Sequence, residues 1–326
     1  MKLLVTGGTG AIGSMVLREL VEQGHEVVSY DLRPDLALLK DIAPDFQMVT
    51  GDVLDHHFLL RSLREYRVEG VVHMAAYLAP GLIGSQSQPF PNRQANVNIT
   101  GLINVLEAAQ VLDIPRVVFI SSKAVYGDVD TPHHYPDYVP VSETYRLNPN
   151  TVYGASKVLG EQLGLAYAAT GGLEFVALRL SLTYGPGKLT RHGKAAGISP
   201  FVESAIRGEG MTCATGADER MDLIYNRDVA KAVRLAVEKR NVESGIYNVG
   251  TGEAVSMSEI KGVIEAKFGV SIEIGPGLDP FQIGQRYFVM DMSKTRQAFA
   301  FEPSYTLSSG IEDYAKLIEK LGLLTV

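Results

Sequence analysis

The chain opens with an apolar segment, residues 2–6, that leads into a glycine-rich turn and then into a helical pattern. Apolar residues recur at helical spacing from Ile12 to Leu20, and the pattern ends at Gly24. The first 24 residues therefore predict a strand, a tight turn and an amphipathic helix.

Strand-like apolar runs continue to alternate with helical patterns through the first half of the chain. We expect strands at 26–31, 46–49, 70–73 and 116–120, and helices at 58–66 and 95–112. This alternation is typical of an α/β fold with a doubly wound parallel sheet. Ligands of such folds bind at the carboxyl ends of the strands.

In the second half the apolar segments are shorter and less regularly spaced, and they occur around residues 201, 223 and 247. This pattern predicts a smaller C-terminal lobe interleaved with the last strands of the sheet. We assign 1–178 mainly to the sheet domain and 179–326 mainly to the lobe, with about 220–250 returning to the sheet. Ser256 and Glu259 form a capping-box pattern that opens a helix through about 268, and a last helix is expected near 311–321.

Composition excludes several classes of function. The net charge of −7 and the 21% of charged residues are spread over many elements, so we expect neither a nucleic-acid partner nor a basic membrane patch. The first residues do not resemble a signal peptide and no apolar run reaches the length of a membrane span, which predicts a cytoplasmic protein. A single cysteine, Cys213, excludes an intrachain disulfide. The acidic and histidine residues between 128 and 134 lack regular ligand spacing, so no metal site is expected.

The glycine turn has the spacing of a dinucleotide site. Gly7 permits the tight turn, Gly10 permits close approach of a pyrophosphate, and Gly13 permits close packing of helix on strand. The backbone of Ala11 and Ile12 lies at the helix N-terminus, which favours an anion. Such a triplet also occurs in ordinary strand-to-helix turns, so the assignment needs further support.

Asp31 supplies that support, because it ends the second predicted strand about 20 residues beyond the glycines. A carboxylate there accepts hydrogen bonds from the adenosine ribose and repels a 2′-phosphate, so we expect NAD rather than NADP although Arg33 lies nearby. Further cofactor contacts are expected at the ends of the next two strands. These are Asp52, Val53, Ala75 and Ala76.

A candidate catalytic group follows in the segment 151–157. Tyr153 and Lys157 lie one turn apart on a predicted helix, and the lysine ammonium would favour the phenolate of the tyrosine. Ser122, at the end of a strand, would hold the substrate oxygen beside Tyr153 for coupled proton and hydride transfer. The alternative is a solvated tyrosine and lysine pair on the helix surface.

These motifs resemble the extended short-chain dehydrogenase/reductases, and specifically the NAD-dependent epimerase/dehydratase family. The similarity covers nearly the whole chain and includes the glycine triplet, Ser122, the Tyr153 and Lys157 pair and the segments 178–186 and 247–250. It implies a Rossmann domain with a C-terminal substrate lobe, Tyr153 as acid and base, Lys157 on the nicotinamide ribose, and Asn96 as a further cofactor contact. Many relatives form homodimers by packing two long helices from each subunit, and helices 95–112 and 153–170 are the counterparts here; the alternative is that their apolar faces belong to the core of one chain. Three residues are candidate substrate contacts: Ser122, Tyr184 and Arg220.

The chain departs from the family at several positions. Lys123 and Ala124 stand where 4,6-dehydratases have an acidic pair, which argues against dehydration. Leu182 replaces an asparagine of nucleotide-sugar epimerases, and Met221 replaces an arginine that grips the diphosphate, with Arg220 displaced by one position. A last arginine of the family has its nearest counterpart in Arg286. These departures weaken the case for a diphosphate ligand.

Three interpretations remain. The favoured one is an NAD-dependent dehydrogenase that oxidises a secondary alcohol of a non-nucleotide sugar, sugar acid or hydroxy acid. The first alternative is a nucleotide-sugar 4-epimerase of the UDP-hexose type that retains its NAD. The second is a non-enzymatic NAD-binding sensor, which the intact Tyr153 and Lys157 argue against.

Overall fold

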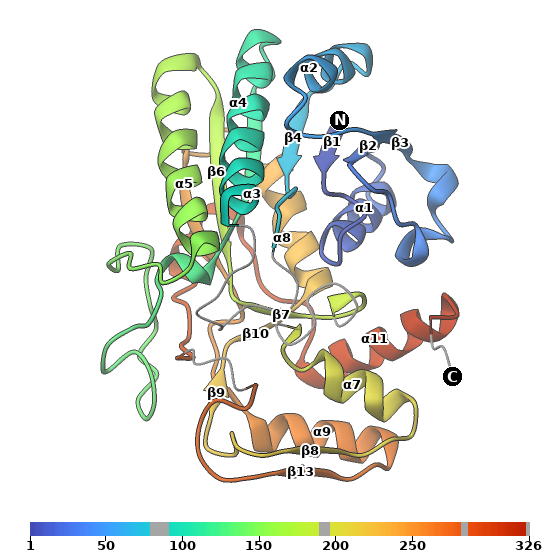
Figure 1. The fold of residues 1–326 in the computed structure, drawn as a ribbon, viewed down its shortest axis with the longest axis vertical. Helices are drawn as coiled ribbons and strands as arrows, with labels where there is room; N and C mark the ends of the chain where they lie inside the picture. Colours follow the sequence, from blue (N-terminus) through green and yellow to red (C-terminus); the bar gives the residue numbers. More distant parts are fainter. Residues whose placement is uncertain (79–90, 189–195, 282–285, 324–326) are drawn as a thin grey trace.

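A seven-stranded sheet in which every strand is parallel to its neighbours forms the centre of the molecule (Figure 1). The computed structural model describes residues 1–78, 91–188, 196–281 and 286–323. The strand order is β11-β6-β5-β4-β1-β2-β3, so the sheet extends in both directions from the first strand. The predicted doubly wound α/β fold is therefore confirmed.

Five strands of this sheet lie in the expected segments, within two residues at either end, whereas β6 and β11 were not predicted as strands. The strands of the sheet are β1 (Lys2–Thr6), β2 (Glu26–Asp31), β3 (Gln47–Thr50), β4 (Gly70–His73), β5 (Arg116–Ser122), β6 (Glu174–Leu180) and β11 (Gly245–Val249).

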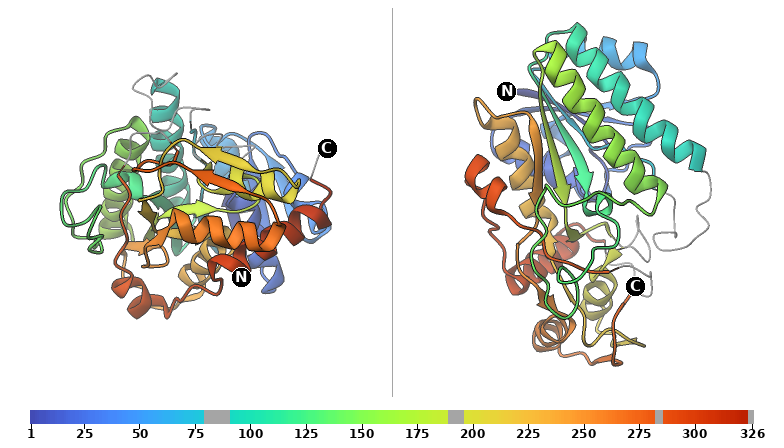
Figure 2. Two further views of the ribbon diagram at one scale, coloured as in Figure 1. Left: turned by 90° about the horizontal axis from the view of Figure 1, so that it is seen from below. Right: turned by 90° about the vertical axis from the view of Figure 1, so that its left-hand side faces the viewer.

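Helices cover both faces of the sheet, as the right-hand view of Figure 2 shows. One face carries α1 (Gly13–Glu22) and α8 (Asn226–Glu238), which pack on each other. The other face carries α2 (His56–Glu65), α4 (Gly101–Val111) and α5 (Val152–Gly171). A short helix, α3 (Pro91–Ala95), and a π-helical turn, Asn96–Thr100, precede α4.

Alternating side chains of β1 show why both faces must be covered. Leu3 and Val5 join the apolar cluster under α1 and α8, and Leu4 joins the cluster under α2 and α4. All three are fully buried. Since successive strand residues point to opposite faces, a strand that is apolar throughout belongs in the middle of such a sheet.

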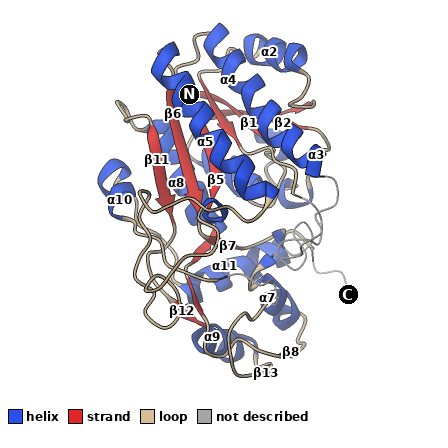
Figure 3. Ribbon diagram, turned by 60° about the vertical axis from the view of Figure 1, so that its left-hand side comes forward, coloured by secondary structure: helices blue, strands red, loops and turns tan. Residues whose placement is uncertain are grey.

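The lobe lies beyond the carboxyl ends of the strands (Figure 3). Its helices are α7 (Ser199–Ile206), α9 (Met257–Phe268) and α11 (Leu307–Lys320), and α10 (Ser293–Phe299) packs beside β11. Among the described residues its strands form three pairs: β7 (Leu182–Tyr184) with β10 (Leu223–Tyr225), β8 (Met211–Cys213) with β13 (Ile272–Ile274), and β9 (Arg220–Met221) with β12 (Val255–Ser256).

The chain passes between sheet and lobe more than once. It leaves the sheet after β6, returns through α8 and β11, and then enters the lobe again. This return lies within the range 220–250 for which the sequence predicts it. The position 178 proposed as a boundary falls inside β6, because the strand continues to Leu180.

The predicted capping box at α9 is confirmed. Ser256 Oγ accepts a 3.1 Å hydrogen bond from Glu259 N, and Glu259 Oε2 accepts one of 2.7 Å from Ser256 N. The last helix begins earlier than predicted, at Leu307, because Thr306 caps it ahead of the first periodic apolar residue.

The outer surfaces of α4 and α5 lie side by side, and each exposes an apolar side chain. Leu159 is 43% exposed and Val111 is 61% exposed. A homodimer through these helices stays a prediction. In the described part of the chain, no helix combines the length and the apolar character needed to cross a bilayer.

Candidate active site

The turn between β1 and α1 requires glycine at positions 7 and 13. Gly7 has a φ of 69°, a conformation that glycine adopts without strain. A Cβ on Gly13 would overlap Gly7 O and would lie 2.9 Å from the Gly8 backbone. Gly10 N donates a 3.1 Å hydrogen bond to Gly7 O, which closes the turn. The glycine spacing thus builds the cradle expected for a pyrophosphate at a helix N-terminus.

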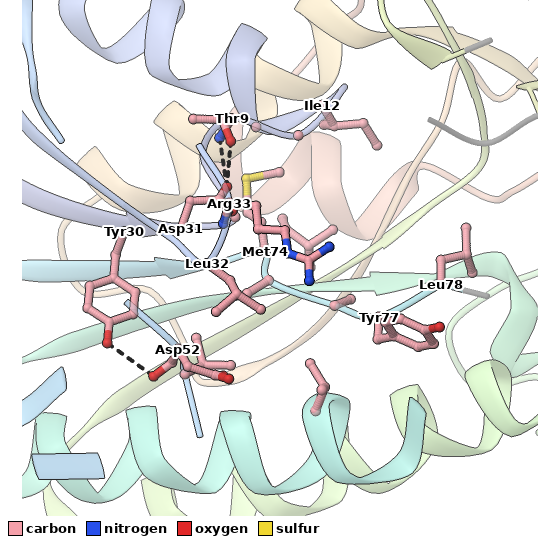
Figure 4. Close-up of a pocket in the computed structure, with 18 of the residues that line it drawn as sticks. Thr9, Ile12, Tyr30, Asp31, Leu32, Arg33, Asp52, Met74, Tyr77 and Leu78 are labelled. Carbon is pink, nitrogen blue, oxygen red and sulfur yellow. Dashed lines mark hydrogen bonds between the residues drawn. The ribbon is translucent and has the colours of Figure 1, made fainter. Parts of the chain in front are cut away.

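A cavity of about 410 Å³ lies beside this turn, at the carboxyl ends of the strands (Figure 4). Most of the predicted cofactor residues line it. They are Gly7, Gly10, Ala11, Ile12, Gly13, Asp31, Asp52, Val53, Ala75, Ala76, Tyr153 and Lys157. The cavity thus extends from the glycine turn to the candidate catalytic pair, and these residues fit a dinucleotide.

Asp31 is held at the cavity by Thr9, a residue that the sequence pattern did not identify as a site residue. Thr9 donates two hydrogen bonds to Asp31 Oδ2, at 2.7 Å from its hydroxyl and 3.2 Å from its backbone N (Figure 4). The carboxylate is therefore oriented before any ligand binds. The position of Thr9 inside the glycine turn is the sequence feature that could have identified it as a site residue.

The helix that precedes α4 differs from the expectation. Asn96 is exposed and does not line the cavity, whereas Val97 does. The buried Asn98 carries the hydrogen bonds instead. Its Oδ1 accepts one of 2.7 Å from Tyr77 N and its Nδ2 donates one of 3.1 Å to Ser156 Oγ. The π-helical turn over 96–100 changes which residues face inward, and periodicity at 3.6 residues does not anticipate it.

Tyr153 and Lys157 lie in the first turns of α5, as predicted. Thr151 caps this helix by accepting a 3.0 Å hydrogen bond from Gly154 N. Lys157 Nζ donates a 2.6 Å hydrogen bond to Ile120 O and lies 5.5 Å from the centre of the Tyr153 ring. Because Lys157 is 3% exposed, the pair is not the solvated alternative.

Ser122 ends β5 close to this pair. Its Oγ accepts a 3.2 Å hydrogen bond from Ala124 N, and its side chain also forms a hydrogen bond with Tyr153. Ser122 is not among the residues lining the described cavity and lies next to it. The structure therefore brings together the three predicted catalytic residues.

The electrostatics of the pair differ from the expectation. Burial raises the pKa of Tyr153 to about 12, and the hydrogen bond with Ser122 opposes this only in part. Burial also lowers the pKa of Lys157 to about 7, against the attraction of Glu161. The sequence suggests that the Lys157 ammonium stabilises the Tyr153 phenolate. In the structure both the phenolate and the ammonium would lose water on burial, and this cost outweighs their attraction.

A buried network of ionic and hydrogen-bonded side chains joins α5 to strands β5 and β6. Glu161 lies one turn after Lys157 and makes a bidentate pair with Arg179 of β6, with contacts of 2.8 and 2.7 Å. Ser121 Oγ donates a further 2.6 Å hydrogen bond to Glu161 Oε1. Glu161 and Arg179 are at most 1% exposed. Glu161 lies four residues after Lys157, and this spacing places the two residues on one face of a helix, so the sequence alone could have paired them.

Two candidate substrate residues lie away from the cavity. Tyr184 is 2% exposed and packs in the lobe core, with its ring 5.2 Å from that of Tyr225. Arg220 is exposed on β9, whereas the next residue, Met221, is 1% exposed. Neighbouring strand residues point in opposite directions, so Arg220 faces away from the lobe core.

The segment 185–197 carries four basic side chains that are candidates for contact with an anionic substrate or, alternatively, solvated surface groups, and it is described only at its ends. Lys188 is 8% exposed, and Arg191, His192 and Lys194 lie outside the described residues.

Asp222 is buried and accepts hydrogen bonds from Thr251 and Met290. No group of three or more metal-ligating side chains occurs within the described ranges.

Comparisons with known proteins agree with this geometry. Residues 3–250 match the family model described as the NAD dependent epimerase/dehydratase family. A putative UDP-glucose 4-epimerase of Methanocaldococcus jannaschii is 31% identical over 311 residues, which cover 95% of this chain and 96% of that protein.

Solved structures show the same similarity. UDP-glucose 4-epimerase of Thermotoga maritima with UDP-glucose is 26% identical with a TM-score of 0.79, over 98% of this chain and 99% of the other. MoeE5 in complex with UDP-glucuronic acid and NAD is 28% identical with a TM-score of 0.78, over the same shares.

Proposed function

The chain belongs to the NAD-dependent epimerase/dehydratase family, and from that premise we propose that it is a nucleotide-sugar epimerase that inverts C4 of a UDP-hexose on NAD that stays bound. The family resemblance seen in the motifs is confirmed, and NAD is the cofactor. The departures of the sequence from the family pattern favour a dehydrogenase. The comparisons support the alternative, a nucleotide-sugar 4-epimerase, better than a dehydrogenase, because relatives that match over nearly their full length are named UDP-glucose 4-epimerases.

The observation that carries the proposal is the continuous cavity from the glycine turn to Tyr153 and Lys157. The backbone of the turn would hold the pyrophosphate, and Asp31 would accept hydrogen bonds from the adenosine ribose. When bound, NAD supplies the hydride acceptor and later the donor, and its oxidised ring supplies a positive charge that favours the phenolate of Tyr153.

The residues of this chain would handle the proton. Tyr153 would take the proton from the C4 hydroxyl as the C4 keto sugar forms, and would return it when the opposite face of C4 is reduced. Ser122 would donate a hydrogen bond to the same oxygen. Lys157, anchored on Ile120 O, would hold the nicotinamide ribose beside Tyr153. Oxidation and reduction balance within one turnover, so no NADH would leave.

One observation favours a second candidate, the dehydrogenase. An exposed Arg220 and a buried Met221 do not offer the arginine that grips a diphosphate in family epimerases. A smaller sugar, sugar acid or hydroxy acid would not need that contact. This enzyme would release NADH, which separates it from the epimerase by experiment.

The test uses the purified full-length chain. Released cofactor is measured by chromatography after denaturation, and UDP-galactose is then added while UDP-glucose and NADH are followed separately. Formation of UDP-glucose without net NADH supports the epimerase. Accumulation of NADH with free sugars or sugar acids, and no interconversion of the UDP-hexoses, would overturn it. Tyr153→Phe serves as the inactive control.

A further inference from the structure

Lys123 lies directly after Ser122, where the sheet meets the lobe. It begins a single helical turn, Lys123–Val125, that Ser122 caps. Its Nζ lies 4.8 Å from the ring centre of Tyr287 and 5.1 Å from that of Phe288. Both rings are buried and come from the segment that leads back from the lobe. The lysine thus places a cation on an aromatic platform beside the candidate catalytic serine.

The Lys123 ammonium contacts these rings but has no hydrogen-bonding or ionic partner in the described part of the chain. Its Nζ donates no hydrogen bond there and has no carboxylate within 4.0 Å. Burial lowers the pKa of Lys123 to about 8, and the more distant Asp222, Glu219 and Asp128 oppose that shift. The side chain therefore remains mostly charged at neutral pH while its donors are unused.

The carboxylates of Asp222 and Glu219 accept hydrogen bonds from groups other than Lys123. Asp222 accepts hydrogen bonds from Thr251 N at 2.8 Å and from Met290 N at 3.2 Å. Glu219 Oε1 accepts one of 2.6 Å from the Tyr138 hydroxyl. A half-buried ammonium with unused donors is costly unless a ligand compensates it. A carboxylate does so better than a hydroxyl, because both partners are then charged.

We propose that Lys123 binds a carboxylate on the sugar of the substrate, so that the enzyme prefers a nucleotide-linked hexuronate to the corresponding neutral hexose. This inference rests on the proposed function, in which C4 is the reacting carbon. A hexuronate carries its carboxylate on C5, next to C4. The Cα atoms of Ser122 and Lys123 are about 3.8 Å apart, so one residue can serve C4 while the other reaches the carboxylate. Lys123 is then a determinant of specificity, distinct from the residues that move the proton.

The test compares two substrates in three proteins that retain NAD. kcat and KM are measured for UDP-glucuronate and UDP-glucose with the wild type, with Lys123→Met and with Lys239→Met, which removes an exposed lysine at the end of α8. Lys123→Met should lower kcat/KM for UDP-glucuronate about 10- to 100-fold and change that for UDP-glucose less than about 3-fold. Lys239→Met should change neither.

Two results would overturn the inference and leave the proposed function intact. One is an equal loss on both substrates in Lys123→Met, which would make the lysine structural. The other is a wild type that epimerises UDP-glucose but does not prefer UDP-glucuronate. If the wild type converts neither nucleotide sugar, the proposed function itself fails. Free glucuronate and glucose, with NADH formation as the readout, then test Lys123, and a wild type that does not prefer the acid overturns the inference.

Discussion

Lys157 Nζ donates a 2.6 Å hydrogen bond to the carbonyl oxygen of Ile120, two residues before Ser122. This bond ties the first turns of α5 to the carboxyl end of β5. It therefore sets the distance between the helix that carries Tyr153 and the strand that carries Ser122. The same lysine lies 4.6 Å from the centre of the Phe119 ring, so aromatic packing and hydrogen bonding fix it together.

Replacing Tyr153 by phenylalanine should remove the acid and base while keeping the ring. We expect turnover to fall by at least about 10²- to 10⁴-fold, because proton transfer is lost. NAD affinity should change little, since the phenol hydroxyl is not part of the glycine cradle. Initial rates and equilibrium binding of NAD check this together. Full activity in the variant would exclude the proposed mechanism.

Glu161→Gln should act on both stability and pH dependence. Breaking the buried pair leaves Arg179 uncompensated, which costs about 3–5 kcal/mol in the free energy of unfolding. The negative charge of Glu161 also raises the pKa of Lys157, so its loss should lower that pKa further. If activity needs the Lys157 ammonium, the alkaline decline of kcat then moves to lower pH.

Two controls separate these effects. Ser121→Ala removes one hydrogen bond from Glu161 and no charge, so the pH profile should stay in place. Combining Glu161→Gln with Arg179→Gln removes both charges and should recover part of the lost stability, as measured by urea denaturation. An unshifted profile in a folded Glu161→Gln variant contradicts the electrostatic role.

Gly13→Ala should disrupt the cofactor cradle. The new Cβ would meet the backbone of Gly7 and Gly8, which cannot rotate away as a side chain can. We expect a loss of about 1–3 kcal/mol in the free energy of unfolding and weaker NAD binding. The matched control is Gly262→Ala in α9, where nothing lies within 4 Å of the added Cβ. This control should be neutral or slightly stabilising. Equal NAD affinity in the two variants would contradict the assignment of the cradle.

His73 should make the protein less stable in acid. Burial lowers the pKa of His73 to about 3, and its Nδ1 lies 2.8 Å from Thr6 Oγ1. Below a pH of about 6.5 the unfolded chain binds a proton at this residue that the folded chain does not. Its contribution to stability is therefore present above that pH and is lost as the pH falls toward 3.

The measurement is the slope of the free energy of unfolding against pH. Between pH 6.5 and 5 the wild type should lose about 1.6 kcal/mol more than His73→Asn, because the slope rises from half of about 1.4 kcal/mol per pH unit at pH 6.5 toward that full value. His57→Asn, which removes an exposed histidine, serves as the control and should retain the slope of the wild type. Parallel slopes for wild type and His73→Asn would show that His73 takes up its proton in the folded state.

Local sequence was sufficient for the first five strands of the sheet and for most of the predicted residues that line the cavity. The glycine triplet, the strand-end Asp31 and the helical spacing of Tyr153 and Lys157 each depend on a few neighbouring residues, and backbone geometry translates such spacings directly into positions. The capping box at Ser256 is equally local. Parallel strands also bring their carboxyl ends to one edge, so Asp52 and Ala75 could be placed at the cavity before strand order was known.

Other features were decided only when distant segments packed together. Asn98 rather than Asn96 faces inward because of a π-helical turn, and Tyr184 is covered by the lobe. The pKa directions of Tyr153 and Lys157 follow from burial, which depends on every element around them and not on their spacing. The pairing of Glu161 with Arg179 joins a helix to a strand, and the contact of Lys123 with the Tyr287 ring joins the sheet to the lobe. The residues in the chain determined which chemistry is available, and tertiary packing determined which charges lie together and how much water they keep.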